Sequence, residues 1–315
     1  MATLGYIQVT RKCNQKCRFC SNPPTGKTLS LKEAISYIDD YIKKGYDGVI
    51  FTGGEPTLSP HLPRLLSYCF QKGIYARIIT NGQRIADFNY LKLLKKTGLY
   101  HLHLSIYSVK PEIQNFLTQN KNSFTNIKKA LENLKKIGGI TVNINTVINK
   151  YNADHLDKNV IWLTKRFPFL RHFVWNNLDP LMSRALKNPD TIPRLSDFEL
   201  SLHRAMEYLS KTGRSFRVEK VPLCYMKGFE HCSTETRRIV KKEKMSTHFL
   251  DKKGFIEINN WVYNRFYSKA ECCKRCSLND ICAGLYQMDK YYASRELHPV
   301  SVDKNKIIRK ILEEN

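Results

Sequence analysis

Residues 10–22 read TRKCNQKCRFCSN and follow directly on the first predicted strand, residues 6–10. Cys13, Cys17 and Cys20 give this loop the spacing C-x3-C-x2-C. A structural zinc site takes four ligands, so His61 or a distant residue would have to supply the fourth. A [4Fe–4S] cluster bound by three thiolates instead keeps one iron without a protein ligand, open to amino and carboxylate groups. The loop therefore predicts a metal or cluster site at the end of the first strand.

Outward from this loop, predicted strands and helices alternate as far as residue 175. Apolar runs of strand length, such as residues 47–52 and 141–148, alternate with helical stretches such as residues 30–44 and 124–139. Six β-α units predict a parallel sheet with right-handed crossovers and are too few for a closed eight-stranded barrel. We expect an α/β fold, a partial (β/α)6 TIM-type barrel, with its chemistry at the carboxyl ends of the strands.

The regular pattern lapses over residues 176–195, and a segment of this length without regular structure is more often functional than filler. Asp179 and Arg184 are its candidates for substrate contacts, with a solvent-exposed connection as the alternative. A helix over residues 196–211 follows, with Ser196 and Glu199 as a predicted capping box. We predict one domain over residues 1–213, with its core at 5–175, and a smaller cysteine-rich domain over 214–315.

The chain has 315 residues and a formal net charge of +24, from 52 Lys and Arg against 28 Asp and Glu. This charge favours anionic partners, whereas a nucleic-acid substrate is compatible with it but not favoured, because the basic residues are scattered through the chain. No apolar run of membrane-spanning length and no secretory segment are visible, so we expect a cytoplasmic protein without a membrane partner. In that compartment clustered cysteines more often hold metal than form disulfides, and the isolated Cys69 is expected to be a buried thiol.

The opening loop and the motifs after it resemble the radical S-adenosylmethionine (SAM) superfamily. The resemblance rests on C-x3-C-x2-C after the first strand and on TGGEP, residues 52–56, at the end of the second. It continues in TNG, residues 80–82, and in polar residues that end later strands. It implies a [4Fe–4S] cluster on Cys13, Cys17 and Cys20, which act as the catalytic centre by binding SAM at the open iron.

The resemblance also implies which side chains contact SAM. Gly53 and Gly54 permit close backbone approach, and Glu55 supplies an acceptor for the methionyl ammonium group. Ser105 and Asn145 have an alternative interpretation as ordinary strand-end polar groups. The full set of expected SAM contacts is Phe19, Gly53, Gly54, Glu55, Pro56, Thr80, Asn81, Ser105 and Asn145.

A second cysteine set lies near the end of the chain. It includes ECCKRCSLNDIC, residues 271–282, where Cys273, Cys276 and Cys282 give C-x2-C-x5-C. This spacing resembles the auxiliary-cluster domains called SPASM and, in shorter form, twitch. The count implies one further [4Fe–4S] cluster on Cys224, Cys273, Cys276 and Cys282. Zinc is the alternative metal; Cys272 could replace Cys273, and Cys232 is a spare thiol, a ligand or a catalytic residue.

The resemblance implies an oxidoreductase or maturase in which SAM cleavage yields a 5′-deoxyadenosyl radical that abstracts hydrogen from the substrate. A peptide or protein side chain is the expected substrate, with the auxiliary cluster in electron transfer. The alternative is oxidation or rearrangement of a small molecule, nucleotide or RNA, which the positive charge favours if that substrate is anionic. The expected redox partner is an electron donor such as flavodoxin or ferredoxin.

Overall fold

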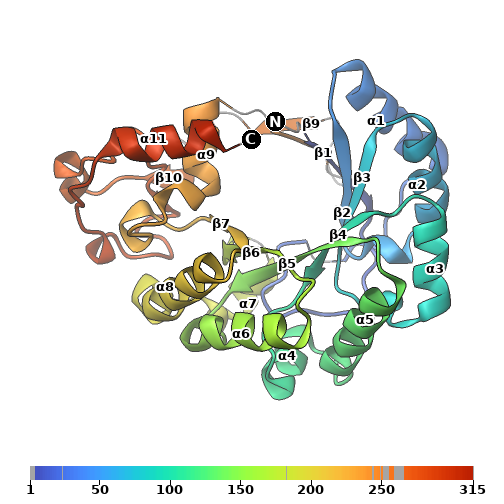
Figure 1. Cartoon of the computed structure of the whole chain (residues 1–315). Helices are drawn as coiled ribbons and strands as arrows, with labels where there is room; N and C mark the ends of the chain where they lie inside the picture. Colours follow the sequence, from blue (N-terminus) through green and yellow to red (C-terminus); the bar gives the residue numbers. More distant parts are fainter. Residues whose placement is uncertain are drawn as a thin grey trace.

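The computed structural model describes residues 4–22, 24–181, 183–242, 245–248, 250, 255–258 and 266–314. Its main sheet has nine strands in the order β7-β6-β5-β4-β3-β2-β1-β8-β9. Strands β1 to β8 are parallel to their neighbours, and β9 is antiparallel to β8. The strands curve around an open interior, and helices cover the outer face (Figure 1). This arrangement confirms the predicted α/β class and the incomplete barrel.

Each strand of the main sheet is short, and most are separated by a helix along the chain. The strands are β1 (Leu4–Thr10), β2 (Gly48–Gly53), β3 (Tyr75–Thr80), β4 (His101–Ser105), β5 (Thr141–Ile148), β6 (His172–Asn177), β7 (Ser215–Glu219), β8 (Met245–His248) and β9 (Phe255–Ile258). A separate two-stranded sheet pairs β10 (Tyr267–Ser268) with β11 (Leu285–Tyr286) in the cysteine-rich region.

The helices connect these strands and continue into the C-terminal part. They are α1 (Leu31–Lys43), α2 (Leu62–Gln71), α3 (Phe88–Lys96), α4 (Pro111–Thr118), α5 (Ser123–Ile137), α6 (Leu156–Arg166), α7 (Ser183–Lys187), α8 (Leu195–Lys211), α9 (Thr234–Lys241) and α11 (Lys304–Glu313). None of the helices in the described ranges is both long and apolar enough to cross a membrane.

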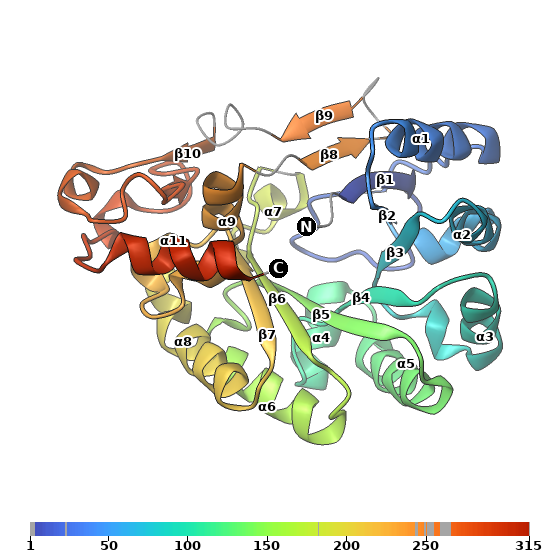
Figure 2. The ribbon, with the colours of Figure 1, turned by 45° about the horizontal axis from the view of Figure 1, so that its top comes forward.

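The sheet is wider than the six strands expected. Strand β7 extends one edge beside β6, and β8 extends the other edge by pairing with β1, as in the register Gly5 to Ser246 (Figure 2). Pairing between segments this far apart in sequence leaves no local periodic signal, which is why the sequence did not reveal it. Residues beyond 213 therefore contribute strands to the barrel sheet, and the division at residue 213 stays a prediction.

Helices α1 and α8 both begin with a capping box. In α1, the Ser30 hydroxyl accepts from the backbone N–H of Glu33, and the Glu33 carboxylate accepts from the backbone N–H of Ser30. The capping box predicted at Ser196 and Glu199 is wrong, because α8 begins one residue earlier and Asp197 accepts from the backbone N–H of Arg194 at 2.9 Å. Helix α4 was missed, because its eight residues are too few for a clear periodic pattern.

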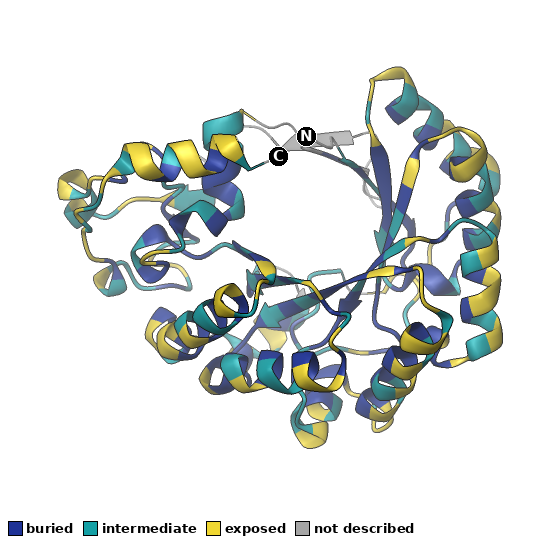
Figure 3. Cartoon of the chain, in the orientation of Figure 1, coloured by how far each residue is buried: buried dark blue, intermediate teal, exposed yellow. Residues whose placement is uncertain are grey.

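The apolar core lies mainly between the outer face of the sheet and the covering helices. Ile78 of β3, Leu65 of α2 and Leu131 of α5 are fully buried, and the helix faces turned to the sheet are buried while their outer faces are exposed (Figure 3). Burial of aliphatic side chains here contributes roughly 1.5–3 kcal/mol each. The interior face of the sheet is thereby free to carry polar residues.

Candidate active site

The cysteine loop is fixed to the end of the neighbouring strand by its backbone. After β1, the carbonyl of Thr10 accepts from the N–H of Gly54 at 2.7 Å, and the carbonyl of Lys12 accepts from the N–H of Glu55 at 2.8 Å. These two bonds continue the β1–β2 ladder past the formal strand ends. The GGE motif therefore holds the loop that carries Cys13.

Both glycines of this motif are required by that close approach. A Cβ atom on Gly53, which has a φ of +134°, would lie 2.0 Å from the carbonyl oxygen of Thr10. A Cβ atom on Gly54 would lie 2.3 Å from the carbonyl oxygen of Lys12. The sequence predicted that another group approaches the backbone of these glycines closely. In the structure, the backbone of the cysteine loop makes such an approach.

Gly54→Ala is expected to destabilise the protein by about 3 kcal/mol or more, because backbone atoms, unlike a side-chain tip, cannot yield to the new methyl group. Thermal unfolding measures this as a fall in Tm. Gly73→Ala is the matched control, because a Cβ there meets nothing within 4 Å and only its φ of +70° is unfavourable, at about 1 kcal/mol. Equal losses in the two variants would contradict the role given to Gly54.

A cavity of about 280 Å³ opens at the carboxyl ends of the strands. Its volume is close to that of the smallest ordinary ligand sites, which range over roughly 300–1,000 Å³. Of the residues expected on the barrel, the structure brings these to its wall: Cys13, Cys17, Phe19, Cys20, Gly53, Gly54, Glu55, Thr80, Asn81, Ser105 and Asn145. Pro56 is not in the wall; it begins the short 3-10 helix Pro56–Leu58, which the Glu55 side chain caps. His61 also lies away from this wall, immediately before α2.

Glu55 is buried and its carboxylate is already occupied by neighbouring donors. One oxygen accepts from the backbone N–H of Thr57 (3.1 Å) and from the hydroxyls of Thr57 (2.6 Å) and Thr80 (2.7 Å). The other accepts from the backbone N–H of Asn81 at 2.7 Å. Burial raises the pKa of Glu55, and these donors oppose it. The carboxylate thus joins the ends of β2 and β3, and it keeps acceptor capacity mainly on the second oxygen.

The three half-buried thiols share a setting that fits a cationic cluster. Burial raises the pKa of Cys13 to about 11 and raises the pKa of Cys17 and Cys20, while Arg184 opposes all three shifts. Such thiols lose their protons when metal binds. The backbone N–H of Asn22 already points at Cys20 Sγ (3.3 Å), as N–H groups do toward cluster sulfurs. The donor set therefore suits a [4Fe–4S] cluster held by three cysteines.

The segment over residues 176–195 is docked onto this loop, not an open connection. Arg18 pairs with Asp190 at 2.9 and 3.2 Å, and Tyr151 donates to the same carboxylate at 2.5 Å. Asn188 donates to the carbonyl of Arg18 at 3.1 Å, and Arg184 to the carbonyl of Cys17 at 3.5 Å. The segment includes the short helix α7 and covers one side of the cysteines. Arg184, expected to face substrate, thus contacts the cluster loop.

The opposite wall of the cavity contains Asp179, which the sequence indicated, and Lys220, which it did not. Lys220 follows β7 and lies 3.8 Å from Asp179 between Nζ and Oδ2, and both side chains are about one quarter exposed. The Lys220 ammonium also lies 5.4 Å from the centre of the Tyr286 ring. Lys220 has a φ of +58°, which is rare for a non-glycine residue and often marks a functional position. Only the β7 pairing could have located it.

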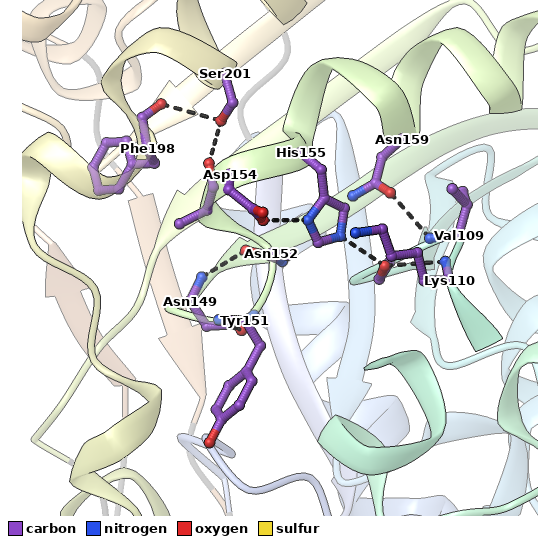
Figure 4. Close-up of polar contacts among 12 residues, drawn as sticks. Val109, Lys110, Asn149, Tyr151, Asn152, Asp154, His155, Asn159, Phe198 and Ser201 are labelled. Carbon is purple, nitrogen blue, oxygen red and sulfur yellow. Dashed lines mark hydrogen bonds and ion pairs between the residues drawn. The ribbon is translucent and has the colours of Figure 1, made fainter. Parts of the chain in front are cut away.

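A buried polar network supports the ends of β4 and β5 behind the cavity. His155 lies beside Asp154, whose carboxylate is 2.5 Å from Nδ1 (Figure 4). The hydroxyl of Ser108 lies 2.9 Å from Nε2 of the same ring. Asn152 donates to the carbonyls of Tyr107 (2.8 Å) and Val147 (2.9 Å), which lie on the cavity rim. Ser108 is fully buried and its oxygen accepts from the backbone N–H of Lys110. The arrangement is that of a rigid support, since a nucleophile would need access to substrate.

The second cysteine set also converges on one place. Cys224, Cys273, Cys276 and Cys282 line one small cavity. Burial raises the pKa of Cys224 to about 12 and raises the pKa of Cys282, whose sulfur accepts from the backbone N–H of Gly284 at 3.3 Å. These four cysteines, one from a distant turn and three from one loop, thus line a shared space, and their binding of a cluster stays a prediction.

Two further cysteines lie outside this cavity. Cys272 points its thiol at the carbonyl of Leu297 (3.5 Å), which favours its neighbour Cys273 as the residue facing the shared space. Cys232 is buried beside Arg217 and Glu314 in a different cavity. In the described ranges, no three His, Cys, Asp or Glu side chains are grouped to hold a single metal ion. Cys69 is fully buried in the apolar core, as predicted.

Known proteins similar to this chain belong to the class that the cysteine loop indicates. The model of the Radical SAM superfamily matches residues 7–163, about half of the chain, and the chain belongs to this superfamily. Membership implies a [4Fe–4S] cluster and SAM as cofactors.

Three curated relatives match parts of the chain. Fe-coproporphyrin III synthase of Methanosarcina barkeri is 34% identical over 46% of this chain and 37% of its own length. The 7,8-dihydro-6-hydroxymethylpterin dimethyltransferase of Methanocaldococcus jannaschii is 26% identical over 81% of this chain and 55% of its own length. PqqA peptide cyclase of Xanthomonas campestris is 28% identical over 48% of this chain and 40% of its own length. The chain therefore spans about a third to a half of these relatives.

The fold likeness extends over the whole chain, including the cysteine-rich part. The solved structure of anSMEcpe with bound AdoMet and the Cp18Cys peptide is similar with a TM-score of 0.64. It covers 99% of this chain and 96% of that one at 19% identity, which establishes similarity of fold alone.

Proposed function

We propose that the chain is a radical SAM enzyme that modifies a peptide or protein side chain oxidatively. Cys13, Cys17 and Cys20 would hold the SAM-binding [4Fe–4S] cluster. A second [4Fe–4S] cluster would be held by Cys224, Cys273, Cys276 and Cys282. The observation that carries the proposal is the single cavity whose wall combines the three thiols with the residues expected to contact SAM.

When bound and reduced, the first cluster with SAM supplies a 5′-deoxyadenosyl radical that abstracts hydrogen from substrate. The contribution of the chain is to position the reactants and exclude water. The segment over residues 176–195 closes one side through Arg18 and Asp190. Phe19, only 4% exposed, packs edge-on against Tyr107 and gives the wall an apolar surface. Asn81, Ser105 and Asn145 offer hydrogen-bonding groups for the ribose and carboxylate of SAM.

Two further parts of the proposal concern partners and location. One-electron reduction of the first cluster requires a donor such as flavodoxin or ferredoxin, and the charge of +24 favours an acidic partner. Ten free thiols suit a reducing compartment, so we propose the cytoplasm.

A peptide substrate is supported by the names of two similar proteins. PqqA peptide cyclase acts on a peptide by its name, and the anSMEcpe structure contains a peptide. The second candidate is a small molecule, supported by the relatives named for a coproporphyrin and a pterin. The ion pair of Asp179 and Lys220 offers a carboxylate acceptor and an ammonium donor, which match the N–H and C=O of one peptide unit.

The test is formation of 5′-deoxyadenosine by the reconstituted, dithionite-reduced protein with SAM, measured by chromatography. Synthetic peptides, a reduced pterin and coproporphyrin III are then added in parallel, with mass spectrometry of each. Stimulation and a mass change with a peptide support the first candidate, and stimulation by the pterin or porphyrin alone supports the second. Absence of 5′-deoxyadenosine from a preparation with full iron content overturns the proposed activity.

Lys220→Gly is expected to abolish stimulation by substrate and to leave unstimulated 5′-deoxyadenosine formation within about threefold, because Lys220 lies across the cavity from the thiols. The same change relieves the positive φ and is expected to raise stability by about 0.5 kcal/mol. Lys242→Gly is the matched control, because Lys242 also has a positive φ (54°) but lies outside the cavity. It should gain stability and keep stimulation; unaltered stimulation in Lys220→Gly would refute the role of this lysine.

A further inference from the structure

A row of polar side chains crosses the sheet below the active cavity. In the parallel register, His103 of β4 is opposite Asn143 of β5, Asn143 is opposite His172 of β6, and His172 is opposite Ser215 of β7. Side chains alternate between the two faces of a strand. His103 is two residues before Ser105, which lines the active cavity. The row therefore faces the barrel interior, one layer deeper than that cavity.

Nitrogen donors also occupy the layers on either side of this one. Arg77 and His101 lie one layer deeper, and Arg217 is level with Ser105. We call Arg77, His101, His103, His172 and Arg217 the donor row. The rings of His101 and His103 stack at 5.3 Å between centroids with an interplanar angle of 5°. His172 is held by the hydroxyl of Ser215 at 2.7 Å from Nδ1. TIM-type barrel interiors are ordinarily filled by branched apolar side chains, so a layer of this composition calls for an explanation.

Three buried nitrogen atoms of the donor row have no partner in the described part of the chain. They are Nε of Arg77 and Nε2 of both His101 and His103. Buried polar atoms are nearly always hydrogen-bonded, and an unpaired one often marks the place of a water or an ion. Arg77 of β3 lies beside His101 of β4, because their neighbours Ile78 and Leu102 are paired, and His103 is two residues further along β4. Three unpaired donors on two adjacent strands point to an acceptor beside those strands.

An open cavity adjoins the row on the side of β6 and β7. It has a volume of about 720 Å³, and His172 and Arg217 form part of its wall together with Arg214, His231 and Lys310. Arg217 already binds one anion, the carboxylate of Glu314, at 3.1 Å. The cavity thus makes the β6 and β7 end of the row accessible to solutes, and its wall already binds an oxyanion of the chain itself.

The charge of the layer identifies the kind of ligand. Burial lowers the pKa of His101 to about 4 and of His103 to about 3, so at neutral pH both are neutral imidazoles. Arg77 and Arg217 each carry a guanidinium group, and that of Arg217 is paired with Glu314. A ligand with several acceptor oxygens and negative charge, as a phosphoryl group has, complements two guanidinium groups and imidazole N–H donors.

We propose that the donor row is a binding site for a phosphoryl group, either inorganic phosphate or a phosphate ester, beneath the active cavity. The site is separate from the cysteine loop, and its occupation does not depend on the proposed activity. Arg77 and Arg217 supply the charge, and His101, His103 and His172 supply directional donors. The net charge of +24 attracts such anions to the protein from solution.

The test is calorimetric titration of the reconstituted full chain with inorganic phosphate at constant ionic strength, with a chloride titration for comparison. Saturable binding of about one phosphate per chain is expected. Arg77→Met and His103→Phe, which keep the side-chain bulk, are each expected to weaken binding about tenfold or more, as loss of a hydrogen bond to a charged group does. Phosphoserine titrated in parallel separates the sources: tighter binding of phosphoserine identifies an ester, and tighter binding of phosphate identifies the free ion.

Lys129→Gln is the matched control, because it removes one exposed positive charge on α5, away from the row. It should bind phosphate like the unaltered protein. Binding that never saturates, or that falls equally in Lys129→Gln and Arg77→Met, would mean general charge attraction and would overturn the proposal. Tm values of all variants, measured without phosphate, show whether a loss of binding reflects a loss of folding.

Discussion

Cys17→Ala is expected to abolish 5′-deoxyadenosine formation, a fall of at least about a thousandfold to the background rate. Two thiols cannot hold a four-iron cluster firmly, so iron content should also fall by about four atoms per chain. The backbone at Cys17 stays supported, because its carbonyl accepts from the N–H of Cys20 at 3.2 Å and from Arg184. The loss should therefore be one of cofactor, not of folding, and circular dichroism should be unchanged.

Cys69→Ala is the matched control for that result. Cys69 is fully buried in α2 and packs only in the apolar core. Its loss should cost about 1 kcal/mol of stability and leave both iron content and 5′-deoxyadenosine formation unchanged. If Cys17→Ala kept its iron and its activity, the assignment of the cysteine loop as the catalytic centre would be wrong.

Cys273→Ala is expected to remove the second cluster, lowering iron by about four atoms per chain from about eight. Uncoupled cleavage of SAM should continue, because the first cluster is bound by other residues, while product formation should fall at least about a hundredfold for want of an electron acceptor. Iron and sulfide assays measure the first effect, and the ratio of product to 5′-deoxyadenosine measures the second.

Cys272→Ala tests the neighbouring thiol, which donates to the carbonyl of Leu297 and is not part of the wall of the shared cavity. It should keep about eight irons. Loss of iron in Cys272→Ala but not in Cys273→Ala would reverse the choice of ligand. About four irons and one zinc in the unaltered protein would show that the four cysteines hold zinc.

Much of the candidate site could be predicted from short stretches of the sequence. Cys13, Cys17 and Cys20 lie within a stretch of eight residues, and the strand before them is enough to place them at the carboxyl edge of the sheet. Glu55, Thr80 and Ser105 end successive strands, so parallel pairing alone brings them together. The sequence did not predict their hydrogen-bond partners. Glu55 is expected to contact SAM, and in the structure its carboxylate accepts from Thr57, Thr80 and Asn81.

The sequence did not predict the site residues that distant segments contribute. Lys220 enters the wall only because β7 pairs with β6, and Asp190 reaches Arg18 only because the segment over residues 176–195 folds back over the cysteine loop. Likewise β8 joins β1 across more than two hundred residues. Such contacts depend on loop closure and on register between remote strands, neither of which has a local periodicity.

The sequence by itself determined the incomplete barrel, the three-cysteine loop and the motifs around it, because each is encoded within a few neighbouring residues. The tertiary structure alone decided that the two glycines serve the cysteine loop and that Cys273, not Cys272, lines the cavity of the second cysteine set. It alone also shows three nitrogen atoms beneath the active cavity that have no partner among the described residues. The physical reason is the same in each case. A side chain's role depends on which buried partners it meets, and those partners are brought from elsewhere in the chain by the packing of the sheet.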